Sequence, residues 1–337
     1  MAVRMVGEFM AVCLFVVSAA MAGLGLAGCE RESPAISGGR PVVVATTGMI
    51  GDVARVIAGD RADVRILMGE GVDPHLYKAS PGDVRLITKA DLVLFNGLHL
   101  EGRMGDVLEG AGGRVKAVGV AERIDPSLLR SPPEFEGNPD PHLWFDVSIW
   151  SRVAEVIRDH LIEADPAGRE QYEKSAAAYL ASLSDLHEWC RSELARIPEQ
   201  RRVLVTAHDA FGYFGRAYGI EVLAIQGVST DSEASLRDIA GLVDMLVRRR
   251  VPAVFVESSV PRKTIDALIE GAAARGHVVR IGGELFSDAM GPAASEEGTY
   301  IGMIRHNVRT IVAALADAGA HAPDQEHPGP AGPSGGR

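Results

Sequence analysis

Two blocks of alternating strand-like and helix-like segments restrict the possible fold more than any other feature of this chain. The expected strands lie at 42–45, 63–67, 91–95 and 115–118 in the first block, and at 203–206, 222–225, 253–256 and 278–281 in the second. The expected helices end near 59, begin at 81, and cover 211–218, 236–250, 262–275 and 300–318. This alternation is typical of βα units with mainly parallel sheets, so we predict an α/β fold.

A long segment between the two blocks has the pattern of one uninterrupted helix. Asp165 and Pro166 are typical of an N-cap followed by a proline at the first helical position, and the pattern continues to about Arg196. Apolar residues recur there at steps of three and four, namely Tyr172, Ala176, Tyr179, Leu183, Leu186, Cys190 and Leu194. About thirty helical residues would extend for ~45 Å, more than one small domain needs. We therefore predict two (β/α) lobes with mainly parallel sheets, joined by one long rigid connecting helix.

The N-terminus has the pattern of an export signal. The run from Phe9 to Gly28 contains no charged residue and ends directly before Cys29, in the sequence Leu-Ala-Gly-Cys. This pattern resembles the lipobox of bacterial lipoproteins, in which the cysteine is lipid-modified and becomes the first mature residue. An uncleaved membrane anchor is the alternative, because the run is almost long enough to span a bilayer. Both interpretations place the remaining chain outside the cytoplasm, and we expect a lipid-anchored protein in the periplasm or on the outer face of the cell envelope.

The expected organisation follows from these segments. It comprises a lipoprotein signal peptide at 1–28, a flexible tether at 29–40, an N-terminal lobe at 41–164, the connecting helix at 165–197, a C-terminal lobe at 198–318 and a disordered tail at 319–337. If Cys13 leaves with the signal and Cys29 carries lipid, Cys190 has no intrachain partner, and we expect it in the core. The net charge of −11 argues against a nucleic-acid partner, which would require a basic patch.

Polar residues that follow the expected strands are the candidates for a binding site, because ligands of open α/β sheets bind beyond the carboxyl ends of strands. The candidates are His75 after the second strand, His142 in the Pro-rich segment 138–146, His208 at the end of the strand that begins at 203, and Asp288 after the last strand. Three imidazoles and a carboxylate would form a site for Zn²⁺ or Mn²⁺. The spacings of 67, 66 and 80 residues follow no local rule, so the residues alone leave this set open.

Other residues compete for these roles. His99 also follows a strand and is the strongest competitor as a ligand. Glu257, at the end of the strand 253–256, could be a fifth ligand, although a hydrogen-bond acceptor for a ligand histidine is its expected role. His306 lies inside the last helix, where we expect a structural hydrogen bond. The sequence contains no H-E-x-x-H, no G-x-S-x-G, no P-loop and no G-x-G-x-x-G after a strand, so enzyme signatures are missing.

Several segments together resemble the metal-binding solute-binding proteins of ABC importers, in the zinc/manganese family and its TroA-like branch. These segments are 73–75, 140–146, 206–214, 257–261, 283–291 and 298–307, and the resemblance covers about residues 41–318. It implies two α/β lobes joined by one long helix, with a metal ion between them. It also implies first-lobe ligands at His75 and His142 and second-lobe ligands at His208 and Asp288. The His-rich loop of many zinc-specific members is absent, since 121–140 contains no histidine.

The function that this resemblance implies is transport. An extracytoplasmic lipoprotein of this family binds Zn²⁺ or Mn²⁺ and delivers it to a cognate ABC membrane permease, and we expect this chain to do so as a monomer and not as an enzyme. The alternative is an exported zinc-dependent hydrolase that uses the same histidines, an open coordination position and Glu257 as base. A surface adhesin is a third possibility.

Overall fold

The computed structural model of the protein describes residues 39–111 and 115–316. The predicted signal peptide at 1–28, the lipidation site Cys29 and the predicted tail at 319–337 lie outside the described residues. Within the described part of the chain, no helix is both long enough and apolar enough to cross a membrane.

The first lobe contains a parallel four-stranded sheet in the order β2-β1-β3-β4. The strands are β1 (Val42–Ala45), β2 (Asp63–Ile66), β3 (Leu92–Phe95) and β4 (Lys116–Gly119), which confirms the four predicted strands of the first block to within one residue at each end. The helices are α2 (Gly48–Ala58), α3 (Pro81–Thr88) and α4 (Gly105–Ala111). Ser80 caps α3 through a reciprocal pair of hydrogen bonds with Asp83, as the Ser-Pro sequence predicts.

The second lobe contains two parallel strand pairs. β5 (Val203–His208) pairs with β6 (Glu221–Gln226), β7 (Ala253–Glu257) pairs with β8 (Arg280–Leu285), and β5 contacts β7. The helices of this lobe are α7 (Gly212–Tyr218), α8 (Leu236–Arg249) and α9 (Lys263–Ala273). Together with the first sheet, these strands confirm the predicted α/β fold with parallel sheets.

The predicted strand at 278–281 is wrong in its bounds. Val278 is 86% exposed, and β8 begins only at Arg280 and continues to Leu285. The predicted strand ends too early because the run of apolar and β-branched residues stops at Ile281, where Gly282 and Gly283 follow. In the structure a side chain at Gly282 would approach Phe255 to 2.7 Å, and the pairing with β7 shifts register beside Phe255, so these glycines mark an irregularity inside the strand.

Two long helices follow one another at the end of the first lobe and after it. α5 (Val147–Ala164) was not assigned from the sequence, although Trp150, Ala154, Ile157 and Leu161 recur at helical steps and are all buried. α6 (Arg169–Leu194) is the predicted long helix, but a 3₁₀ turn at Pro166–Gly168 precedes it. Asp165 and Pro166 therefore begin this 3₁₀ turn and not the long helix, whose N-cap is Gly168. The carboxylate of Asp165 accepts hydrogen bonds from Arg61 and Tyr172.

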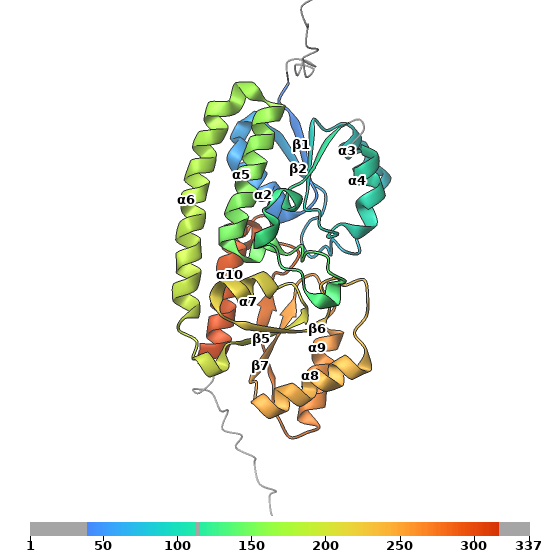
Figure 1. Ribbon diagram of the computed structural model, residues 1–337, viewed down its shortest axis with the longest axis vertical. Coiled ribbons are helices and arrows are strands. Elements are labelled where there is room, and N and C mark those ends of the chain that lie inside the picture. The colour runs from blue at the N-terminus through green and yellow to red at the C-terminus, as the bar shows by residue number, and fades with distance from the viewer. Residues whose placement is uncertain (1–38, 112–114, 317–337) are drawn as a thin grey trace, which may run out of the picture. The chain divides into compact units, whose positions relative to one another are not determined.

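All seven residues of the predicted apolar stripe on α6 are buried, and Cys190 among them is a free buried cysteine. In Figure 1, α6 lies alongside elements of both lobes. It contacts α2, α5 and α7, and also α10 (Tyr300–Ala316), the last described helix. The stripe therefore packs against helices from distant parts of the sequence.

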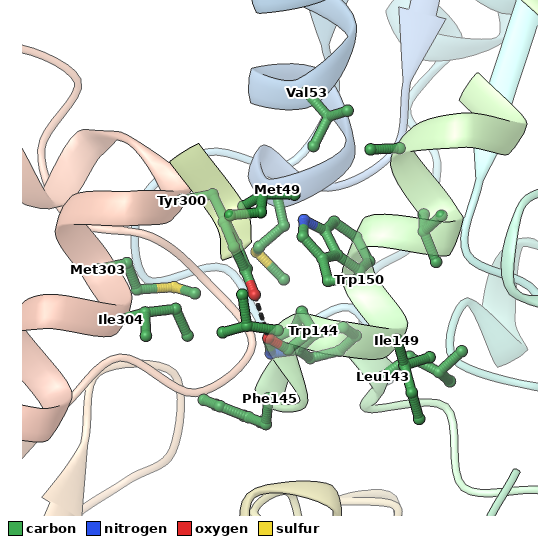
Figure 2. Packing of buried hydrophobic residues seen from close by; sticks show 14 of the residues in the cluster. Met49, Val53, Leu143, Trp144, Phe145, Ile149, Trp150, Tyr300, Met303 and Ile304 are labelled. Atoms are coloured by element: carbon green, nitrogen blue, oxygen red, sulfur yellow. Dashed lines mark hydrogen bonds between the residues drawn. The ribbon is translucent and has the colours of Figure 1, made fainter. Parts of the chain in front are cut away.

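The hydrophobic core is continuous from one lobe into the other. One buried cluster includes residues of α2, α5, α6, α7 and α10. Figure 2 shows its centre, where Trp150 stacks on Tyr300 with ring centroids 5.4 Å apart. The hydroxyl of Tyr300 donates a hydrogen bond of 2.7 Å to the carbonyl oxygen of Trp144, and Nε1 of Trp144 donates one of 2.9 Å to the carbonyl oxygen of Ser287. Apolar burial and hydrogen bonds thus join the two lobes next to the candidate site.

Candidate metal centre

The four predicted ligand residues come together in one buried group. His75 lies in the connection between β2 and α3, His142 directly precedes the short turn before α5, His208 is the last residue of β5, and Asp288 follows β8 by three residues. One ligand atom from each residue lies within 4.8 Å of all the others. The exposed fractions are 3% for His75, 2% for Asp288 and 0% for the other two residues. The packing of the two lobes thus brings together residues that are far apart in sequence.

The spacing of the ligand atoms suits a metal ion. Nε2 of His75 lies 3.4 Å from Nε2 of His142, and Nε2 of His142 lies 3.4 Å from Oδ1 of Asp288. Oδ2 of Asp288 lies 3.2 Å from Nε2 of His208 and 4.0 Å from Nε2 of His75. Ligand atoms at about 2.1 Å from a tetrahedral Zn²⁺ are separated by roughly 3.4 Å. Three of these four separations are close to that value, so the group is of a size that could surround a metal ion.

Three polar atoms of this group have no hydrogen-bond partner within the described part of the chain. Both carboxylate oxygens of Asp288 and Nε2 of His208 are buried without a hydrogen bond. A buried carboxylate that has lost its hydration is energetically costly unless neighbouring positive charges compensate it. A bound cation would compensate these atoms directly, so the residues present fit a metal ion as ligand.

Carboxylates hydrogen-bond to two of the three imidazoles at Nδ1, the ring nitrogen that points away from the other ligand atoms. Nδ1 of His142 lies 2.8 Å from Oδ1 of Asp140, and Nδ1 of His208 lies 2.6 Å from Oε2 of Glu257. The other oxygen of Glu257 accepts hydrogen bonds from the backbone nitrogens of Ala207 and His208. A hydrogen bond from Nδ1 orients the ring and leaves the Nε2 lone pair for a metal ion. Glu257 thus lies behind His208 and outside the group of four.

Asp140 has a position that the sequence analysis did not assign. Its Oδ1 accepts a hydrogen bond from the backbone nitrogen of His142, and Oδ1 of Asp73 makes the same contact with the backbone nitrogen of His75. The sequence signal for this contact is the repeated Asp-Pro-His triplet, in which the aspartate precedes each histidine by two residues. The repeated triplet could have indicated these supporting carboxylates.

The charges within the group depend strongly on one another. Burial lowers the pKa of His75 to about 3. Burial also disfavours the charged form of His142, but its hydrogen bond with Asp140 and the neighbouring carboxylate of Asp288 outweigh this effect and raise its pKa to about 9. For His208, the charges of Glu257 and Asp288 likewise outweigh burial and raise the pKa well above its ordinary value. Burial alone would raise the pKa of Asp288, but the neighbouring His208 and His142 outweigh burial and hold this pKa well below its usual range. Protons thus balance the ionised Asp288, and a divalent cation could replace them.

The other histidine candidates lie outside this group. His99 is exposed, has a positive φ of 67°, and lines a cavity of about 500 Å³ with Glu101 and Glu122. Nε2 of His306 lies 3.1 Å from the carbonyl oxygen of Glu284, which is the structural hydrogen bond expected for this residue. Among the described residues, the group formed by His75, His142, His208 and Asp288 has the arrangement of a metal site.

Comparisons with known proteins identify the family of the chain. The family model described as "Zinc-uptake complex component A periplasmic" matches residues 43–314, a range that includes the whole group. The chain is 48% identical over 296 residues to the manganese-binding lipoprotein MntA of Bacillus subtilis, covering 87% of this chain and 96% of that protein. It is 50% identical over 282 residues to the zinc-binding protein TroA of Treponema pallidum, covering 84% and 91%.

A solved structure extends the likeness to three dimensions. The structure of the periplasmic zinc-binding protein TroA from Treponema pallidum superposes with a TM-score of 0.81 at 50% identity. The match covers 82% of this chain and 100% of that one. The likeness therefore includes both lobes and the long helix between them.

Proposed function

The chain belongs to the family of periplasmic zinc-uptake component A proteins, and we propose that it binds Zn²⁺ or Mn²⁺ between its two lobes and delivers the ion to the membrane permease of an ABC importer. The observation that carries this proposal is the buried group of three imidazoles and one carboxylate, in which Nε2 of His208 and both carboxylate oxygens of Asp288 have no hydrogen-bond partner among the described residues. Its relatives are named as manganese-binding and zinc-binding proteins, in agreement with a transition-metal cargo.

In this proposal His75, His142, His208 and Asp288 are the four metal ligands. Four protein ligands leave a tetrahedral ion without an open position for water or substrate, which suits holding the ion and not catalysis. A hydrolase would need such an open position, and Glu257, its expected base, is hydrogen-bonded to His208 and the adjacent backbone. The relatives give no support to a hydrolase or an adhesin.

The same residues are compatible with either metal. Imidazole suits Zn²⁺, and the carboxylate of Asp288 offers two unpaired oxygens, which would allow the higher coordination number that Mn²⁺ prefers. Zn²⁺ binds more tightly than Mn²⁺ at almost any nitrogen and oxygen site, so relative affinity in vitro does not identify the cargo.

We further propose that lipid on Cys29 anchors the mature protein to the envelope as a monomer. The Leu-Ala-Gly-Cys sequence supports this, as does the lipoprotein name of the Bacillus subtilis relative. The proposed lobes are 41–164 and 198–318, with 165–197 as the connecting helix. Metabolic labelling with a fatty acid, compared between the wild type and Cys29→Ala, tests the anchor, and an equally labelled variant would contradict it.

Elemental analysis tests the proposed cargo. The protein is purified from its native envelope without chelator or added metal, beside an Asp288→Ala variant prepared in the same way. We expect about one Zn²⁺ or Mn²⁺ per wild-type chain and a large loss in the variant. Equal metal content in both proteins would contradict the assigned site, and a wild type without transition metal would contradict the function.

A further inference from the structure

The three histidines of the metal centre are not supported equally. Within the described part of the chain, carboxylates hold the rings of His142 and His208 through Nδ1. His75 is held differently, because among the described residues its backbone nitrogen, and not its Nδ1, donates to a carboxylate, at 2.8 Å from Oδ1 of Asp73. The placement of His75 therefore depends on the loop that carries it, and on Asp73 in particular.

The second lobe holds Asp73 in place. Oγ1 of Thr230, in the connection between β6 and α8, donates a hydrogen bond of 2.6 Å to Oδ2 of Asp73. Thr230 is 9% exposed, and Asp73 is half-buried. The same first-lobe loop approaches the second lobe again at Gly71, where a side chain would lie 3.6 Å from the carbonyl oxygen of Ser258. One carboxylate thus joins a second-lobe hydroxyl to the backbone of a first-lobe ligand.

We propose that Thr230 is a positioning residue for His75, acting through Asp73 across the boundary between the lobes, and that its hydroxyl slows release of the bound metal. The inference rests on the proposed metal-binding function. While this contact is intact, the hydroxyl of Thr230 donates a hydrogen bond to Asp73, and Asp73 in turn keeps the loop that carries His75 next to the other three ligands. When the contact breaks, His75 is the ligand that loses its support.

The neighbouring residue makes a contact of a different kind. Asp231 forms an ion pair with Arg103 of the first lobe, and the side chains of these two residues are 57% and 40% exposed. Exposed ion pairs contribute little, because water and salt screen them. A hydrogen bond to a partly buried carboxylate is stronger, because water replaces it less well. Asp231 is therefore a matched control for Thr230 on the same interlobe segment.

The test measures how fast the Zn²⁺-loaded mature protein transfers its ion to an excess of a chromogenic chelator. We expect Thr230→Val, which keeps the shape and removes the hydroxyl, to release Zn²⁺ about tenfold faster than the wild type. Thr230→Ser retains a hydroxyl at this position, and Asp231→Ala does not change Thr230. The Zn²⁺ release rates of these two variants should therefore lie within about twofold of the wild-type rate. Thr230→Ala is a second variant without the hydroxyl, and thermal unfolding of the metal-free proteins checks that each variant folds.

A double-mutant cycle separates positioning from a general structural effect. If Thr230 acts through Asp73, Thr230→Val should not accelerate release further in an Asp73→Ala background, which keeps all four proposed ligands. Additive effects, an equal effect of Asp231→Ala, or an unchanged rate in Thr230→Val would each overturn the inference. A wild type that does not bind Zn²⁺ would instead contradict the proposed function, so the two failures are distinguishable.

Discussion

Oδ1 of Asp140 lies 2.8 Å from the ring nitrogen Nδ1 of His142 and 2.9 Å from its backbone nitrogen. A single carboxylate oxygen therefore orients both the ring and the main chain of a proposed metal ligand. Asp140 is itself held by Arg130, which pairs with its Oδ2, and by Tyr213 of the second lobe, whose hydroxyl donates to its carbonyl oxygen at 2.9 Å. This carboxylate thus connects the ligand to both lobes.

Asp140→Ala should weaken metal binding although Asp140 is not a ligand. Loss of such a supporting carboxylate typically costs about 10- to 100-fold in affinity, because the imidazole loses its orientation and some basicity. Competition with a chelator of known affinity measures the effect. Asp125→Ala is the matched control, since Asp125 is an exposed aspartate that only caps the turn at Pro126–Leu128. Equal affinities of the two variants would contradict the role assigned to Asp140.

The two first-lobe candidates His75 and His99 should respond differently to truncation. His75→Ala and Asp288→Ala remove members of the buried group, and we expect the thermal stabilisation by added Zn²⁺ to decrease strongly in both variants. His99→Ala should keep the wild-type shift, because His99 is exposed and outside the group. Differential scanning fluorimetry with and without metal measures this, and a smaller shift in His99→Ala would show that the choice between the two histidines is wrong.

Metal affinity should increase with pH. His142 and His208 have raised pKa values in the metal-free protein, about 9 for His142, so they hold protons that the metal must displace. Below those pKa values each added proton competes with the metal, and apparent affinity falls as the pH falls. His75 contributes no such competition near neutral pH, because its pKa is lowered to about 3.

Two measurements check this pH dependence. Chelator competition from about pH 9 to about pH 5 should show a continuous loss of affinity, and metal addition to weakly buffered protein at neutral pH should release protons. An affinity that does not change between about pH 7 and about pH 5 would refute ligation by His142 and His208.

Metal removal should not separate the lobes widely. The core is continuous through α2, α5, α6, α7 and α10, and Trp144 is hydrogen-bonded to Ser287 and Tyr300 beside the site. Opening the lobes would expose this buried apolar surface, at a free-energy cost proportional to its area. Small-angle scattering of the metal-free and metal-loaded proteins should therefore give closely similar profiles. We infer that docking on the permease releases the ion by withdrawing the ligands of one lobe, and a clearly larger radius of gyration without metal would contradict this.

Local patterns were sufficient for most of the secondary structure. The seven apolar residues of the α6 stripe are all buried because helical periodicity alone determines which residues share a face. Helical periodicity is also present in α5, although that helix is not among the predicted elements. The bounds of β8 differ from the predicted strand because two glycines lie inside it. Asp165 resembled a cap, yet its carboxylate pairs with Arg61, a residue from the opposite end of the first lobe's sequence.

The sequence by itself determined which residues could bind a metal, through strand ends and the resemblance of several segments to a known family. Only the tertiary structure decided that His75, His142, His208 and Asp288 share one centre, with Asp140 and Glu257 behind two of the rings and Thr230 reaching Asp73 from the other lobe. The physical reason is the range of the interactions. Helix and strand signals arise between residues a few positions apart, whereas this centre arises from the packing of two lobes whose residues are 66 to 80 positions apart in sequence.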